Sequence, residues 1–170
     1  MRIFLSLILC TLPLTAQQAK PIFDGKSLAG WNVHNGDEKY WTVKDGMIVG
    51  GSLTEKVKWN TFLSTEKSYQ NFELTFKVRM VNGSGFANSG MQVRSQRKGR
   101  SMAGYQVDIG KGYWGKMYDE HRRNKMIGHP VDPAALAKVV KEEGWNDYKI
   151  ICNGPRIQSW INGVAALDYT

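Results

Sequence analysis

Cysteine is nearly absent from this 170-residue chain, which holds only Cys10 and Cys152. Cys10 lies in an apolar N-terminal run typical of a cleaved leader, so Cys152 would remain alone and no disulfide could form within the mature chain. Cys152 ends the largely apolar run Tyr148–Cys152, where a buried, unreactive thiol is the default. Stability must therefore come from a packed core. An exported chain without disulfides fits a bacterial envelope better than an animal extracellular fluid.

The chain also lacks a hydrophobic run long enough to cross a membrane. The longest apolar stretch, Ile3–Leu12, is well short of the roughly 20 residues that a membrane-spanning helix needs. It follows the positive charge of Arg2 and precedes the small residue Ala16, which is the pattern of a secretory signal peptide over residues 1–16. The bulky Leu9 before Cys10 disfavours a lipid anchor. We therefore expect an exported protein, periplasmic or extracellular.

Histidine is scarce, and its three copies lack the spacing of a zinc site. Asp119, Glu120 and His121 could touch a hard cation, but adjacent residues on a strand diverge, so at most some of them can converge. The sequence indicates no cofactor, and a divalent metal ion stays open. Nucleic acid is not an expected partner, because the basic residues behind the net charge of +8 are scattered rather than clustered.

Helical patterns are rare as well, whereas strand patterns fill the chain. Residues 72–79, 91–96 and 105–109 alternate apolar and polar side chains, and residues 148–152 and 156–161 flank an Asn-Gly-Pro turn. One segment predicts a helix: Asp132 as cap, Pro133 at its first position and good helix formers over 134–142. Many short strands with close turns predict an antiparallel sandwich or barrel.

Alternation sorts each strand into an apolar and a polar face. If the strands are neighbours, one sheet face would carry five polar residues together: Glu73, Gln92, Arg94, Gln106 and Asp108. An ordinary solvated outer face remains the alternative. The aromatic residues Tyr113, Trp114 and Tyr118 follow Asp108 closely, and such rings stack on sugars whose hydroxyls are bound by amides and carboxylates.

Six segments occur in an order that resembles the 3-keto-disaccharide hydrolase domain over residues 21–170: IFDGKSLAGWNV, WTVKDGMIVGG, YQNFELTFKVRM, NSGMQVRS, GYQVDIG and WNDYKIICNGPRIQSWINGVAALDYT. The resemblance implies a bacterial, concanavalin-A-like jelly-roll sandwich with substrate on the concave sheet. It also implies one or two further strands beyond Thr170, so that the strand near Asp168 would lack a partner. One departure matters: many members carry an acid where this chain has Gln106 and an amide where it has Asp108.

The chemistry implied by this resemblance is cleavage of 3-keto-glucosides, in which the ketone acidifies the C2 proton and a base promotes elimination before hydration. Asp108 is the expected base, with Glu73 or Glu120 as substitutes. Arg94 would stabilise the oxyanion unless a divalent metal does so. The expected substrate-binding residues are Asn88, Gln92, Gln106, Trp114, Tyr118, Asp119 and Arg123. The rival hypothesis is a non-catalytic glycan-binding module on the same fold.

Overall fold

The computed structural model describes residues 18–81 and 87–170, and the expected signal peptide, residues 1–16, lies outside them. The strands are β1 Trp31–Val33, β2 Trp41–Lys44, β3 Met47–Gly50, β4 Leu63–Thr65, β5 Phe72–Val78, β6 Ser89–Lys98, β7 Ser101–Ile109, β8 Met117–Glu120, β9 Met126–Gly128, β10 Asn146–Asn153, β11 Arg156–Ile161 and β12 Val164–Tyr169. Two helices accompany them, the 3-10 turn η1 Glu38–Tyr40 and α1 Pro133–Val139.

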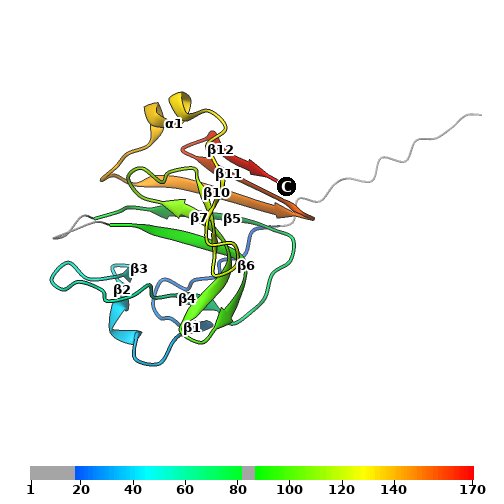
Figure 1. Ribbon diagram of the computed structural model, residues 1–170. Helices are drawn as coiled ribbons and strands as arrows, with labels where there is room; N and C mark the ends of the chain where they lie inside the picture. The colour runs from blue at the N-terminus through cyan, green and yellow to red at the C-terminus, as the bar shows by residue number, and fades with distance from the viewer. Residues whose placement is uncertain (1–17, 82–86) are drawn as a thin grey trace, which may run out of the picture.

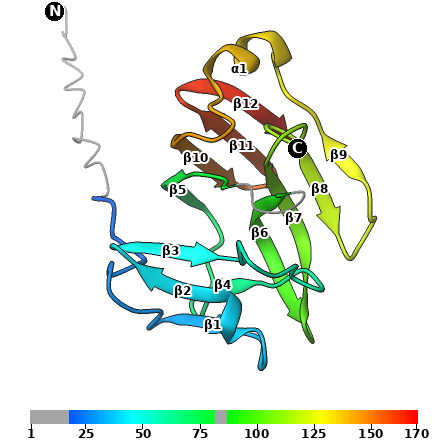
Figure 2. The same cartoon turned by 90° about the vertical axis from the view of Figure 1, so that its left-hand side faces the viewer.

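Two four-stranded antiparallel sheets form the sandwich (Figures 1 and 2). One has the order β6-β7-β8-β9 and the other β12-β11-β10-β5, and two short ribbons, β1-β4 and β2-β3, lie beside them. The expectation of an all-β jelly-roll sandwich with one short helix is confirmed. No helix in the described ranges is long and apolar enough to cross a membrane.

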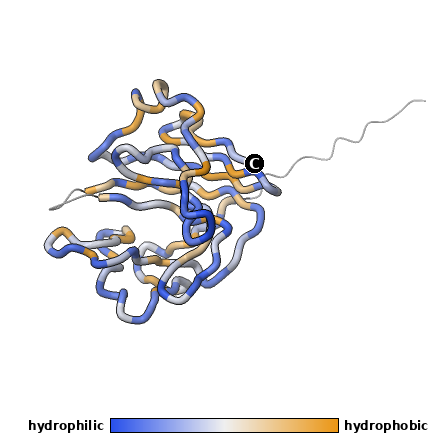
Figure 3. Tube along the Cα trace, viewed as in Figure 1, coloured by the Kyte–Doolittle hydropathy of each residue, from blue (hydrophilic) through white to orange (hydrophobic). Residues whose placement is uncertain are grey.

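The core lies between the two large sheets. Val107 and Ile109 of β7 pack there with Tyr148, Ile150 and Cys152 of β10, since alternate residues of each strand point inward. Figure 3 shows hydrophobic stretches along the β10–β12 region and in the helical segment that covers its end. Cys152 is buried and free, as the sequence indicated.

The helix starts as predicted and ends early. Asp132 caps it by accepting a hydrogen bond from the amide of Ala135 at 2.9 Å. Helix α1 stops at Val139 rather than Glu142, because the side chain of Asn146 holds both the amide and the carbonyl of Lys141 in a turn, at 2.9 and 2.8 Å.

Two expectations about strand pairing are wrong. Strand β5 pairs with β10, from Phe72 opposite Cys152 to Val78 opposite Asn146, and so belongs to the sheet that does not contain β6 and β7. Strand β12, which was expected to lack a partner, pairs with β11. Both pairings place apolar side chains of β5 and β12 against the core.

Two arginines tie the ribbons to the β6–β7 hairpin. The Nη2 of Arg97 donates to the carbonyls of Asn32 and Phe62 and to the hydroxyl of Ser64. Arg100 forms an ion pair with the fully buried carboxylate of Asp37, which lies between β1 and η1 and also accepts a hydrogen bond from Trp59, between β3 and β4. These contacts hold the ribbons at the end of β6 and β7 that carries the hairpin turn.

Candidate active site

Of the five residues expected on one polar face, three lie together on the side of the β6–β7 sheet turned away from the core: Gln92, Gln106 and Asp108. Gln92 of β6 lies opposite Gln106 of β7, which lies opposite Tyr118 of β8. Asp108 follows Gln106 on the same face, and Glu120 follows Tyr118. Five of the predicted site residues therefore share one face of one sheet: Gln92, Gln106, Asp108, Tyr118 and Glu120.

A β-bulge between Val93 and Gln96 overturns the placement of Arg94. Two residues, Arg94 and Ser95, here oppose the single residue Gly104, so that Ser95 and not Arg94 lies on the polar face. Arg94 has a φ of 51° and approaches the core residue Cys152. Burial raises the pKa of the Cys152 thiol, and the Arg94 guanidinium opposes part of that rise. The expected oxyanion role of Arg94 is incompatible with this position.

Asp108 is the most unusual group on the polar face, because its carboxylate is only 2% exposed. Gln106 Nε2 donates to its Oδ1 at 2.8 Å, whereas Oδ2 has no hydrogen-bond partner among the described residues. Burial raises the pKa of Asp108 to about 6, and the charge of Glu120 adds to this rise. The hydrogen bond from Gln106 and the positive charge of Lys116 oppose it.

The backbone of Asp108 is fixed from both sides. Its amide donates to the carbonyl of Lys116 at 3.0 Å, and its carbonyl accepts a hydrogen bond from the buried hydroxyl of Tyr148 at 3.1 Å. The backbone of Asp108 is thus anchored to the residue before β8 in its own sheet and to β10 in the facing sheet. This rigidity is what a catalytic group needs, because a misplaced base loses much of its effect.

The surroundings of Asp108 supply a cation, a second carboxyl group and a ring. Lys116 lies just before β8, where its carbonyl accepts the hydrogen bond from the Asp108 amide, and by alternation its side chain shares the polar face. Glu120 is nearly buried, with His121 Nε2 3.3 Å from its Oε1. Tyr118 is half-buried between them on β8, and Asn88 is exposed just before β6.

Trp114, expected to stack on sugar, lies in the core instead. It is 7% exposed, its ring centroid lies 6.3 Å from that of Tyr148, and its Nε1 donates to Glu142 at 3.0 Å. The turn after β7 folds the indole inward, where its large apolar area is worth more than at the rim.

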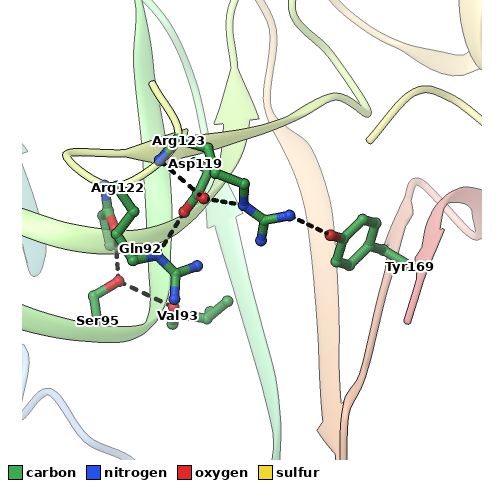
Figure 4. A network of polar contacts seen from close by, with 7 residues as sticks. All are labelled: Gln92, Val93, Ser95, Asp119, Arg122, Arg123 and Tyr169. Carbon is green, nitrogen blue, oxygen red and sulfur yellow. Dashed lines mark hydrogen bonds and ion pairs between the residues drawn. The ribbon is translucent and has the colours of Figure 1, made fainter. Parts of the chain in front are cut away.

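Asp119 and Arg123 also lie away from Asp108, because Asp119 pairs with Tyr105 on the other face of the sheet. Figure 4 shows Arg123 reaching from Asp119 to the hydroxyl of Tyr169 in β12, which ties the two sheets together. Although burial acts to raise it, hydrogen bonds from Arg123 and Arg122 hold the pKa of Asp119 below its usual value. Both residues are structural in this position.

Glu73 is the last predicted residue that the fold removes from the site. It is exposed on the outer face of β5, opposite Ile151 of β10. The residues that sequence reasoning missed are Ser95 and Lys116. Gly104 was a usable signal for Ser95, since an isolated glycine within a strand often marks a bulge or a close approach.

Two surface hollows lie elsewhere. One of about 530 Å³ is lined by Arg94, Tyr69 and Asn71 among others, and one of about 520 Å³ lies over the outer face of β5, β10 and β11. Neither is lined by Asp108. Within residues 18–81 and 87–170 no three Asp, Glu, His or Cys side chains gather in a set that could hold a metal ion.

The chain has clear relatives at the level of family and fold. The family model of the 3-keto-alpha-glucoside-1,2-lyase-like domain matches residues 18–170. A crystal structure of a candidate glycosyl hydrolase from Parabacteroides distasonis ATCC 8503 is similar in fold, with a TM-score of 0.60 and 23% sequence identity over 87% of this chain and 70% of that one. No curated protein matches the sequence.

Proposed function

The chain belongs to the 3-keto-alpha-glucoside-1,2-lyase-like domain family, and on that premise we propose that it cleaves the glycosidic bond of 3-keto-glucosides. The reaction would be an elimination followed by hydration, with Asp108 as the base. This mechanism needs one carboxylate and a stabiliser for the enolate oxygen, whereas an ordinary glycosidase needs two carboxylates that flank the bond.

The proposed steps balance as follows. The C2–H bond breaks and its proton passes to Oδ2 of Asp108, while the electron pair moves toward the C3 ketone and forms an enolate. The enolate pair then forms the C1–C2 double bond as the C1–O bond breaks, and the leaving oxygen takes up a proton. Water then adds across that double bond, with its hydroxyl at C1 and a proton from solvent at C2, and Asp108 releases the proton it accepted to solvent, which restores the base.

The state of Asp108 is the observation that supports this function best. A buried carboxylate with a free oxygen and a pKa near 6 is mostly ionised at neutral pH and is still basic enough to accept a proton. Most exposed surface carboxylates lack both properties. A solvated outer face, the simple alternative for this polar surface, does not account for an aspartate that is 2% exposed.

The remaining roles follow from position. Lys116, beside Asp108, is the cation available for the enolate oxygen, in the role first expected for Arg94. Tyr118 offers a ring for the sugar, and the leaving oxygen would take its proton from solvent water. The proposed chemistry relies on no metal ion.

The rival function, a non-catalytic glycan-binding module, has one observation in its favour. The hollow beside Arg94 does not include Asp108, and Tyr69, which lines it, is 45% exposed and could offer its ring for stacking. A binding module would hold glycans there and turn over none.

Turnover of matched substrates separates the two functions. The protein should cleave a 3-keto-α-glucoside and leave the parent α-glucoside, which lacks only the ketone, intact. Asp108→Asn should lower kcat by roughly 10²–10⁴-fold with little change in binding. Asp147→Asn, a matched change at an exposed carboxylate in the other sheet, should keep full activity. Absence of turnover by the unaltered full chain would favour the binding module.

Export is part of the proposal and rests on the pattern of residues 1–16. Mass spectrometry of the secreted protein should find a mature chain that starts near Gln17. A secreted chain that retains Arg2 would contradict this.

A further inference from the structure

We propose that Ser95, Gln92 and Gln106 form a one-directional hydrogen-bond relay that fixes Asp108 through Oδ1 and reserves Oδ2 for the substrate proton. Ser95 and Gln92 are then positioning residues, which touch no reacting atom. The inference rests on the proposed function in one respect, that Asp108 is the base.

The relay runs across β6 and β7 on the polar face. The hydroxyl of Ser95 lies 2.6 Å from Gln92 Oε1, Gln92 Nε2 lies 3.3 Å from Gln106 Oε1, and Gln106 Nε2 lies 2.8 Å from Asp108 Oδ1. Figure 4 shows the Ser95 end, where the hydroxyl stands between Gln92 and the carbonyl of Val93, 3.0 Å away. A hydroxyl has one proton to donate, and the shorter of the two contacts is the one to Gln92.

Chemistry sets the direction of this chain. An ionised carboxylate only accepts hydrogen bonds, so Gln106 must present its NH₂ group to Asp108 and its carbonyl to Gln92. Gln92 must then present its NH₂ group to Gln106 and its carbonyl to Ser95, which has to donate. Asp108 thus fixes the orientation of the Gln106 amide, and Gln106 in turn fixes that of the Gln92 amide. Every donor in the chain therefore points toward Asp108.

Two glycines and the bulge leave room for the relay. A Cβ atom on Gly90 would lie 2.7 Å from Cδ of Gln106, and a Cβ atom on Gly104 would lie 2.6 Å from the Cα of Ser95. Without the bulge, strict alternation would turn Ser95 to the core side and remove the first donor. The glycines and the bulge thus serve one arrangement of side chains.

The relay decides which oxygen of Asp108 can react. Oδ1 is occupied by Gln106, whereas Oδ2 has no partner among the described residues, so a proton taken from substrate goes to Oδ2. The other groups that act on the carboxylate are Glu120 of β8, Lys116 just before β8 and, through the Asp108 carbonyl, Tyr148 of β10. Among the neighbours named for its pKa, Gln106 has the largest effect, and that effect stabilises the ionised form.

The test is the titration of Asp108 by carbon NMR of the labelled full chain, without substrate. Ser95→Ala removes the first donor, and Gln92→Met removes the middle link at similar side-chain length. Either change lets Gln106 rotate or flip away from Oδ1, so the pKa of Asp108 should rise, by about 0.5 for Ser95→Ala and by about 1 for Gln92→Met. Ser89→Ala, the same change on the same strand but on the opposite face, should leave this pKa unchanged.

The outcomes separate the relay from the proposed function. A raised pKa in the variants supports the relay even if the protein cleaves no 3-keto-glucoside. An Asp108 pKa within about 0.2 of the unaltered value in both Ser95→Ala and Gln92→Met overturns the relay, even if turnover is found. If Ser95→Ala does not fold, Gln92→Met alone decides. In an active enzyme the acid limb of the kcat/KM profile should move with this pKa while KM stays constant.

Discussion

Replacing Asp108 with asparagine should change how the stability of the protein depends on pH. Burial raises the pKa of Asp108 from 3.8 to about 6 in the folded state, a rise that corresponds to about 3 kcal/mol. Because the folded pKa is the higher one, protonated Asp108 favours the fold. Its contribution is fully present below pH 3.8 and is lost as the pH rises through 6, once the buried carboxylate must carry a charge.

The asparagine of the Asp108→Asn variant would carry no such charge at any pH. Its carbonyl can keep the hydrogen bond from Gln106, and the cost of its unpartnered NH₂ group does not vary with pH. The difference in free energy of unfolding between variant and unaltered protein should therefore shift in favour of the variant by about 2.5 kcal/mol between about pH 4 and about pH 8.

Urea unfolding at both pH values, with the slope of each transition compared, measures this difference. Asp147→Asn serves as control, because the Asp147 carboxylate is 66% exposed. The free energy of unfolding of this variant should depend on pH in the same way as that of the unaltered protein. If the free energy of unfolding of Asp108→Asn also followed the pH dependence of the unaltered protein, Asp108 would titrate as an ordinary surface acid. The reasoning about its environment would then be wrong.

Three further changes test the structure around the site. Gly104→Ala should destabilise the protein by about 1–3 kcal/mol in urea unfolding, because the new Cβ would press on the backbone of Ser95, and a loss under about 0.5 kcal/mol would speak against the close packing of the bulge. Arg100→Ala should cost about 2–4 kcal/mol by leaving the buried Asp37 carboxylate without its cation, whereas Lys39→Ala, at an exposed ion pair, should cost under about 1 kcal/mol; equal effects would contradict the burial of Asp37. Trp114→Phe should lower the melting temperature, since the hydrogen bond to Glu142 is lost, but leave KM unchanged, and a large rise in KM would restore Trp114 to the sugar site.

Alternation predicted the part of the site that lies on regular strands. Gln106 and Asp108 are two residues apart on β7, where strict period two holds, and Gln92 lies before the bulge on β6. Arg94 lies within the bulge, so the same rule placed it on the wrong face. The extra residue leaves the apolar pattern of the strand almost intact, and only Gly104 on the partner strand hints at it.

Which strands are neighbours could not be read from their patterns. Strand β5 alternates as regularly as β7, but alternation fixes the face of a side chain and not the sheet that the strand joins, and so Glu73 was assigned to the wrong sheet. The sugar-binding roles predicted for Trp114 and Asp119 were wrong for a related reason. An indole or a carboxylate suits a sugar site, but each was satisfied inside the fold, by Glu142 and by two arginines.

Elimination differs from direct hydrolysis in the fate of the hydrogen at C2, and this gives the most direct test of the proposed mechanism. Cleavage of a 3-keto-α-glucoside in deuterium oxide should yield a 3-keto-glucose that carries deuterium at C2, detected by proton NMR soon after mixing. As a control, 3-keto-glucose is incubated in deuterium oxide with the Asp108→Asn variant, which measures the spontaneous exchange of the C2 hydrogen next to the ketone. If the product of the unaltered enzyme keeps its original C2 hydrogen, no base has removed that proton, and the role assigned to Asp108 is contradicted.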